Sequence, residues 1–426
     1  MSADLRAPAR AASMGIVLAG LALILAFSPR ATAADIHLTA TFQPSILEPS
    51  RNTFVNTSPN APLCENRPDV CRNHPGMELP FQVDYGRFDP EASGIHHAHF
   101  RFPDGDHMGG PIKVTVKHTE TGESTTLGWR ATMIAGTYVL PRPVKDIVGV
   151  DSADNEQLHG MLWGTSWQTS PDECGSVSYG SARATSYTWA WQLPGNREYC
   201  TKMARYEFES MRMENMVMAY QLTAPDPLAM KNGTYEGELW LNIGNAGNLD
   251  FGANAQASDS WLILHFTLTV SHFFDVRFPA GADTLLLHPE GGWQRWVDYH
   301  ERPQSLVNEL PFEVTTSSGF SVQARCGIES GPHCGLRRDG ETTVVPLQMD
   351  LTVPGMVEEA TGRAVQRTRV PTEHSALPMR LATNATMVNR PSRLRFLVEG
   401  AAVDTLLDAP GSEWSGDVTV VFDSEP

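Results

Sequence analysis

The chain is 426 residues long and carries 49 acidic against 32 basic side chains, a formal net charge of −17. Nucleic acids and anionic membrane surfaces attract clustered Lys and Arg, so this balance argues against either as a partner. A chain of this length is too long for one ordinary hydrophobic core and predicts two domains, or three.

Residues 1–33 have the features of a secretory signal peptide. Arg6 and Arg10 precede an uncharged run over 14–27, and Ala31-Thr32-Ala33 is a small-residue cleavage site. The run is short against the ~20 residues that a membrane-spanning helix needs, although an uncleaved anchor helix is the alternative. We therefore expect an exported mature protein that is soluble.

The chain contains six cysteines. An even number in an exported protein predicts disulfides, and sequential pairing is the simplest of several arrangements. Zinc binding through cysteine is disfavoured because no Cys-x-x-Cys pair occurs. The sequential pairs are Cys64 with Cys71, Cys174 with Cys200, and Cys326 with Cys334.

Short runs of alternating or β-branched residues recur between Gly, Pro, Asn and Asp, and helical periodicity is nearly absent. Such runs predict strands, and Ile112–His118 followed by 124–131 predicts a hairpin. With 35 Gly and 30 Pro, we predict an all-β fold of sandwich-like layers. The other predicted strands are 36–42, Trp261–Val270, 273–278, 342–353 and 394–398. The Met-rich segment 211–220 fits a short helix or a buried strand.

A domain boundary is predicted near residue 305. Residues 301–305 have a linker-like composition, and a fresh strand begins at Pro311. The remaining chain has the length of one immunoglobulin-like sandwich. We predict one β-domain over 34–305 and a second over 306–426.

The chain ends on a predicted strand. Val418, Val420 and Phe422 alternate with other residues, which is the period-2 pattern of a strand with one buried face. No strand follows to pair with it, so we expect its edge to be open to another chain. These three residues are the predicted assembly strand.

Together these features resemble the tip adhesins of bacterial chaperone–usher fimbriae. The resemblance covers nearly the whole mature chain, and the C-terminal segment is its most specific part. The segments that carry it are 414–423, 390–398, 345–354, 52–59 and 249–252.

The resemblance implies that the second domain is an incomplete immunoglobulin-like pilin fold lacking its last strand. In such subunits a periplasmic chaperone fills the open groove, and at the outer-membrane usher the next subunit donates a strand instead. It also implies a location at the pilus tip on the cell surface and a first domain that binds a glycan or protein receptor. We expect 36–42 to be the first strand of that domain, with a donor strand as the alternative.

Aromatic residues gather around Cys174 and Cys200. Sugars dock on exposed aromatic faces through C–H groups, while Asp, Asn and Gln hydrogen-bond their hydroxyls. We predict receptor contact within 160–206, with burial in the core as the alternative for any single ring. The predicted receptor-binding residues are Trp163, Trp167, Trp189 and Trp191.

A histidine-rich segment offers a candidate metal site. On a strand His97 and His99 share one face, a spacing that suits two ligands, and His107 follows a turn that folds it back as a third. Zinc is the expected metal, and a solvated histidine-rich strand is the alternative. Further candidate third ligands are His74, His118 and His159.

Enzyme signatures are missing from the sequence. It has no Gly-x-Ser-x-Gly, no His-Glu-x-x-His and no phosphate loop. We expect a non-enzymatic adhesin with no cofactor other than this zinc. The alternatives are a secreted β-sandwich carbohydrate-active enzyme, which needs paired carboxylates in a cleft, and a fimbrial shaft subunit, for which the chain is too long.

Overall fold

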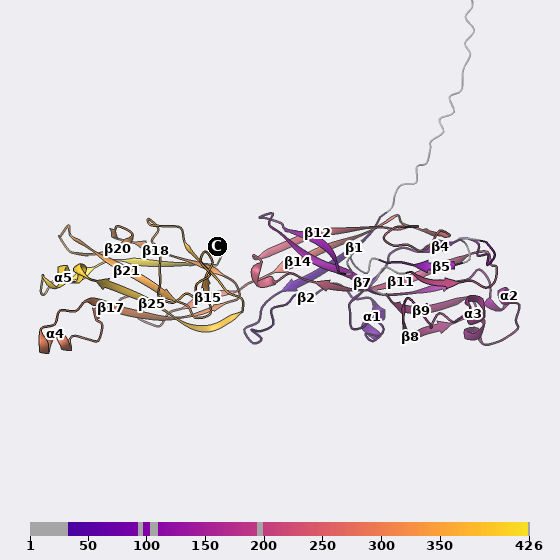
Figure 1. The fold of residues 1–426 in the computed structure, drawn as a ribbon, viewed down its shortest axis with the longest axis horizontal. Coiled ribbons are helices and arrows are strands. Elements are labelled where there is room, and N and C mark those ends of the chain that lie inside the picture. Colours follow the sequence, from indigo (N-terminus) through magenta and orange to yellow (C-terminus); the bar gives the residue numbers. More distant parts are fainter. Residues whose placement is uncertain (1–32, 93–96, 103–109, 194–198, 425–426) are drawn as a thin grey trace, which may run out of the picture.

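The computed structural model describes residues 33–92, 97–102, 110–193 and 199–424, so the predicted signal peptide falls outside the described residues. The structure is 47% strand and 9% helix, which confirms the all-β prediction. Two β-lobes lie end to end (Figure 1). Within the described ranges, no helix has the length and apolarity needed to cross a membrane.

The first lobe contains a 12-stranded sheet and a two-stranded ribbon. Its strands are β1 (Ala33–Phe42), β2 (Val55–Asn56), β3 (Gly76–Glu78), β4 (Val83–Tyr85), β5 (His97–Phe100), β6 (Ile112–His118), β7 (Ser124–Val139), β8 (Gly175–Ala182), β9 (Ser186–Gln192), β10 (Cys200–Met203), β11 (Met211–Thr223), β12 (Gly233–Asn242), β13 (Ala255–Ala257) and β14 (Trp261–Val270). Its helical segments are α1 (Pro62–Asn66), α2 (Val144–Val148), α3 (Asn155–Trp163) and the 3-10 turn η1 (Pro227–Ala229).

The large sheet follows the order β13-β4-β11-β7-β6-β12-β14-β1-β2, and β5 pairs with β10 in the ribbon. The predicted hairpin is β6 with β7, and the ambiguous Met-rich segment is the buried strand β11, which pairs with β7. Long alternating strands bury large rings inside the sheet, and Trp129, Tyr138 and Tyr220 are fully buried.

The segment 36–42 serves its own lobe. It lies in β1, which pairs in parallel with β14 and antiparallel with β2. The expectation that it is the first strand of this domain is therefore confirmed, because its backbone already has partners on both sides.

Three disulfides form in the sequential pattern. The cysteines of Cys64–Cys71 and Cys326–Cys334 are 7 and 8 residues apart in the sequence. Those of Cys174–Cys200, in the first lobe, are 26 residues apart. The short loops tie local turns, and the longer one joins the chain before β8 to the start of β10.

The second lobe packs two main sheets on each other around one apolar core. Its elements are β15 (Phe274–Arg277), β16 (His288–Pro289), α4 (Gln294–Tyr299), β17 (Ser305–Thr316), β18 (Phe320–Cys326), β19 (Glu329–Ser330), β20 (His333–Arg338), β21 (Val344–Thr352), β22 (Val357–Glu358), β23 (Thr368–Arg369), β24 (Met379–Ala382), β25 (Met387–Glu399), α5 (Ala401–Leu407), β26 (Trp414–Ser415) and β27 (Val418–Asp423). One sheet runs β15-β17-β25-β21-β20-β19, and the other runs β22-β24-β18-β27.

The second lobe begins about thirty residues before the predicted boundary at 305. Strand β15 pairs with β17, and Phe274 packs on the core of the second lobe. The polar stretch 301–305 has the composition of a linker, but Arg302 in it forms ion pairs with Asp404 and Asp408 of the same lobe. The boundary is therefore corrected to residues 271–273.

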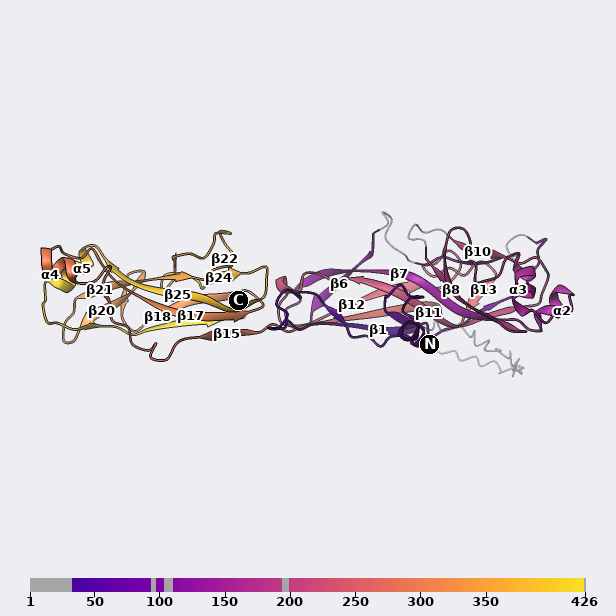
Figure 2. The same ribbon diagram turned by 90° about the horizontal axis from the view of Figure 1, so that it is seen from below.

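His272 lies between β14 and β15, at the junction of the two lobes. Figure 2 shows the two lobes joined in line. The Nε2 of His272 donates to the Met230 carbonyl at 2.8 Å, and its Nδ1 lies 3.0 Å from the Ser317 hydroxyl in the second lobe. Burial lowers the pKa of His272, which favours the neutral ring that accepts from Ser317. One side chain thus contacts both lobes.

The corrected boundary can be tested with two fragments of the mature chain, 34–272 and 34–305. We expect both to contain a folded first lobe, and residues 274–305 to lack amide protection in the longer fragment because β17, the partner of β15, is missing. Hydrogen–deuterium exchange measures this directly. Protected amides over 274–277 in the longer fragment would restore the boundary at 305.

Candidate functional site

Strand β27 forms an edge of the second lobe. Its described ladder runs antiparallel to β18 alone, from Val418 opposite Cys326 to Asp423 opposite Ser321. An edge strand presents backbone N–H and C=O groups that another strand can pair with. The predicted terminal strand is therefore present and lies at a sheet edge, and its role in assembly stays a prediction.

Burial falls steeply across this edge. On β18, Val322 and Ala324 have no exposed surface. Their partners on β27, Phe422 and Val420, pack on the same core but are only half-buried, as is Val418. The apolar row of β18 thus continues onto β27, where its side chains remain partly exposed to solvent.

The other main sheet has a matching edge at β15. Phe274 and Val276 on β15 are half-buried, while Val314 of the paired strand β17 is fully buried. The rings of Phe278 and Phe422 lie 6.2 Å apart, centroid to centroid. The half-covered apolar rows of the two sheets therefore approach each other, and we call this region the β15–β27 edge.

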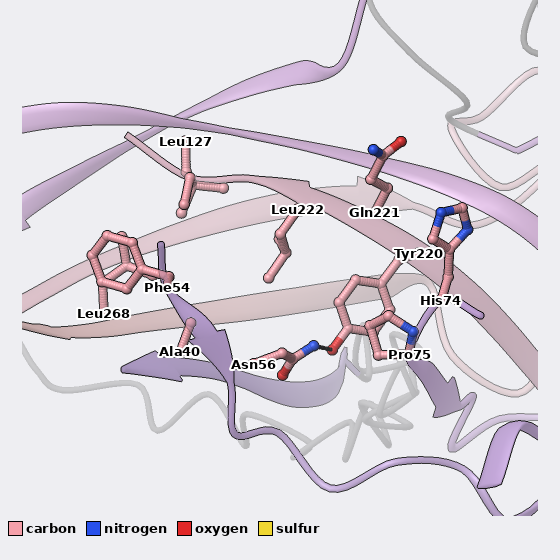
Figure 3. Close-up of a pocket in the computed structure, with 11 residues that line it drawn as sticks. Ala40, Phe54, Asn56, His74, Pro75, Leu127, Tyr220, Gln221, Leu222 and Leu268 are labelled. Atoms are coloured by element: carbon pink, nitrogen blue, oxygen red, sulfur yellow. Dashed lines mark hydrogen bonds between the residues drawn. The ribbon is translucent and has the colours of Figure 1, made fainter. Parts of the chain in front are cut away.

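A cavity of about 200 Å³ lies in the first lobe between strands of the large sheet (Figure 3). Leucine and phenylalanine side chains form one end, and at the other the Asn56 amide donates to the Tyr220 hydroxyl at 3.0 Å. The lining residues are Ala40, Phe54, Asn56, His74, Pro75, Leu127, Tyr220, Gln221, Leu222, Ala224 and Leu268. No carboxylate is among them, so this cavity lacks the acid pair that a glycosidase needs.

A wider hollow in the first lobe is also free of carboxylates in its lining. Its residues are Gln157, Gly160, Met161, Gly164, Arg205 and Tyr206. Neither hollow therefore favours the carbohydrate-active enzyme that the sequence left as an alternative.

The four tryptophans predicted to contact a receptor lie in the core. Trp163 is 3% exposed and the other three are 0% exposed. Their rings pack against one another, with Trp189 and Trp191 4.2 Å apart and Trp167 and Trp191 4.9 Å apart. This placement corrects the prediction, because rings in such a cluster present no face to a glycan.

The surface tryptophans of the first lobe are others, Trp240 and Trp261, with 54% and 37% of their surface exposed. Alternation in the sequence could have found them. Leu239 and Leu241 flank Trp240 and point inward, so the ring between them must point outward.

The proposed metal ligands are only partly within the described residues. His97 is half-buried on β5, while the side chain of His99 and the whole of His107 lie outside the description. In the described ranges, no three His, Cys, Asp or Glu side chains gather as metal ligands. The zinc site remains a prediction.

The three further candidate ligands each hydrogen-bond within the fold. His74 Nδ1 lies 3.1 Å from the Thr132 hydroxyl, and the Nε2 atoms of His118 and His159 bond to backbone carbonyls at 2.8 Å. A ring nitrogen held by a carbonyl carries the hydrogen and offers no lone pair there to a metal.

Sequence reasoning missed a buried lysine. Lys202 on β10 is 4% exposed, and its Nζ donates to the Thr165 hydroxyl at 2.6 Å and the Ser166 carbonyl at 2.8 Å. Both partners are neutral, so burial lowers its pKa to about 8. No sequence pattern distinguishes it from a surface lysine on a short strand.

No protein-family model matches the chain, and no curated protein matches it. Solved structures similar to it include a chain of the chaperone–tip adhesin complex of CFA/I fimbriae, with 10% identity, a TM-score of 0.22, and coverage of 92% of this chain and 96% of that one. CfaE, the adhesive subunit of the CFA/I fimbria of enterotoxigenic Escherichia coli, matches with 9% identity, a TM-score of 0.21 and 92% coverage of each chain.

A chain of the CsuC–CsuE chaperone–tip subunit complex from the archaic Csu pili of Acinetobacter baumannii matches with 9% identity, a TM-score of 0.19, and coverage of 92% of this chain and 98% of that one. The matched structures are thus of the class that the sequence resembles.

The lowered pKa of Lys202 predicts a pH dependence of stability. Between pH ~8 and ~10.5 the unfolded chain holds a proton that the folded chain has released, so the free energy of unfolding rises with pH across this window. Relative to Lys202→Met, we expect the wild type to gain ~1–2 kcal/mol between pH 8 and 10.

Urea unfolding of the first-lobe fragment 34–272 and of its Lys202→Met variant, followed by tryptophan fluorescence at several pH values, measures this gain. The difference between the two proteins should be flat below pH 7, where Lys202 is protonated in both states. A difference that stays constant up to pH 10 would contradict the assignment.

Proposed function

We propose that this protein is a non-enzymatic tip adhesin of a chaperone–usher pilus, and that a strand from another protein completes its second lobe. The observation that carries this proposal is the β15–β27 edge. There, an apolar row on β27 is only half-buried, and the strand has a pairing partner, β18, on one side only. The row consists of Val418, Val420 and Phe422.

A strand placed along β27 would satisfy two requirements together. Its backbone would pair with the edge groups of β27, and its alternate side chains would cover the half-buried apolar rows of β27 and β15. Each apolar side chain that becomes fully buried contributes on the order of 1 kcal/mol.

An open edge of this kind invites non-specific pairing, so the isolated chain needs protection before assembly. A periplasmic chaperone would supply the first strand, and the next pilus subunit would replace it at the outer-membrane usher. The proposed location of the mature protein is the tip of the fimbrium on the cell surface.

The first lobe is the receptor-binding part under this proposal. The segment 36–42 is already paired in β1, between β14 and β2, so in this fold it is not available as a donor strand for a further subunit. A chain that accepts a strand and donates none ends a fibre, as a tip subunit does.

Zinc bound by His97, His99 and His107 remains part of the proposal for this lobe, and a chelator during receptor assays tests it.

The proposal can be tested by supplying a strand in cis. We would append to the C-terminus a Gly/Ser linker and a strand of alternating Val and Thr, with a control in which every appended Val is Ser. Only the Val-containing strand should keep the protein monomeric and raise the thermal midpoint of the second lobe by roughly 5–10 °C. A mature chain that is monomeric and refolds reversibly without any added strand would contradict the proposal.

Two isosteric substitutions on β27 provide a matched pair. Val420→Thr places a hydroxyl in the row that packs on the core, whereas the neighbouring Val421 lies on the other face of the strand. We expect Val420→Thr to halve or abolish the stabilisation by the appended strand, and Val421→Thr to leave it intact. Equal effects of the two would mean that the strand docks elsewhere.

A further inference from the structure

The outward face of β12, β14 and β1 carries an ordered array of polar and aromatic side chains. The strand register places Trp240 opposite Ile263 and Ile263 opposite Asp35, and the next outward row is Glu238, His265 and His37. Trp261 begins the same face of β14 and lies opposite Asn242. These residues come together only through strand pairing, since β1 and β14 are more than 200 residues apart in the sequence.

The two tryptophans of this face lie next to each other. Their ring centroids are 6.1 Å apart at an interplanar angle of 72°, and both rings are well exposed. Exposed tryptophan is a large apolar surface left in water, so an uncovered pair beside the polar side chains of Glu238, His265 and Asp35 suggests a binding surface.

A chain of polar contacts holds Trp240 in place. Its indole Nε1 donates to Glu238 Oε2 at 2.9 Å, and Glu238 Oε1 lies 3.1 Å from His265 Nδ1. On its other side His265 Nε2 lies 2.9 Å from Asp35 Oδ1. His37 stacks on the His265 ring at 4.8 Å. The ring face of Trp240 is therefore oriented before any ligand arrives, which reduces the ordering cost of binding.

The same contacts leave acceptor capacity on both carboxylates. A carboxylate offers about four lone-pair sites, and the contacts above use two on Glu238 and one on Asp35. Hydrogen-bond acceptors thus stand beside an exposed aromatic face.

We propose that this surface, which we call the Trp240 platform (Trp240, Trp261, Glu238, His265 and Asp35), binds a neutral pyranose residue of a glycan. The C–H face of the sugar would lie on the Trp240 ring, and its hydroxyls would donate to Glu238 and Asp35. The carboxylates repel anionic sugars, so the platform selects neutral over sialylated glycans. This inference rests on the proposed adhesin function, for which it names the ligand class.

Other occupants fit the platform less well. A protein partner needs ~800 Å² on each side, whereas the next outward rows beyond Glu238 on β14 and β1 are threonines. A pyranose combines a small apolar face with a ring of donors, which matches the array.

Glycan binding by the full mature chain tests the platform. The probes are methyl glycosides of galactose, mannose and N-acetylglucosamine, with 3′-sialyllactose as the anionic comparison, measured by saturation-transfer NMR and a glycan array. We expect millimolar binding of at least one neutral glycoside and weaker binding of sialylated glycans. Trp240→Ala should reduce neutral-glycan binding at least tenfold.

Two further variants serve as a probe of the carboxylate and as a control. Glu238→Gln retains the size of the side chain, so it should weaken binding severalfold with an unchanged thermal midpoint. Trp293→Ala removes another exposed tryptophan, 44% exposed in the second lobe, and should have no effect. Binding that is equal in the wild type and Trp240→Ala, or the absence of any neutral-glycan binding, would overturn the inference.

The outcome is separable from that of the proposed function. Strand complementation at β27 is measured on the other lobe, with Val420→Thr as its probe. If complementation occurs but Trp240→Ala binds glycans normally, the adhesin proposal stands and the platform does not. If glycans bind at the platform but no strand is accepted, the platform stands and the tip-adhesin proposal fails.

Discussion

The second lobe depends on one constraint, that every strand of a sandwich must be paired and its inner face covered. Strand β18 meets this constraint because it has β24 on one side and β27 on the other. Strand β27 meets it on one side only, and its inner row is half-buried as a result. The proposed donor strand would pair with the backbone groups on the uncovered side and would also cover the apolar row.

The same period-2 geometry organises the surface of the first lobe. Each strand divides its residues between two faces, so Leu239 and Leu241 enter the core while Glu238 and Trp240 reach solvent. Pairing then brings the outward residues of distant strands into one array. The Trp240 platform is thus a product of register: a shift of β12 by one residue would bury Trp240 and expose Leu239.

Alternation made much of this fold predictable from the sequence. The strands β6, β14 and β27 are predicted close to their observed bounds because alternation is a local signal, whereas β7 continues from the predicted end at residue 131 to Val139. The boundary was misplaced because residues 301–305 have the composition of a linker, and only the pairing of β15 with β17 shows where the second lobe begins. The receptor tryptophans were misplaced because the composition around Cys174 does not distinguish an aromatic core from an aromatic surface. The alternation of Trp240 with Leu239 and Leu241 does predict that the Trp240 ring is exposed.

The covalent path between the two proposed sites is short. Strand β14 carries Trp261 and His265 of the platform, and it leads through residues 271–273 directly into β15, one side of the β15–β27 edge. If both proposals hold, tension between a glycan on the first lobe and a strand bound to the second would pass along β14. Strands β1 and β12 pair with β14 over its whole length. A force along β14 would therefore act parallel to these strands and would have to shear their backbone hydrogen bonds together. At the junction, His272 is bonded to Met230 on one side and to Ser317 on the other, so the two lobes share a polar contact in addition to the chain itself.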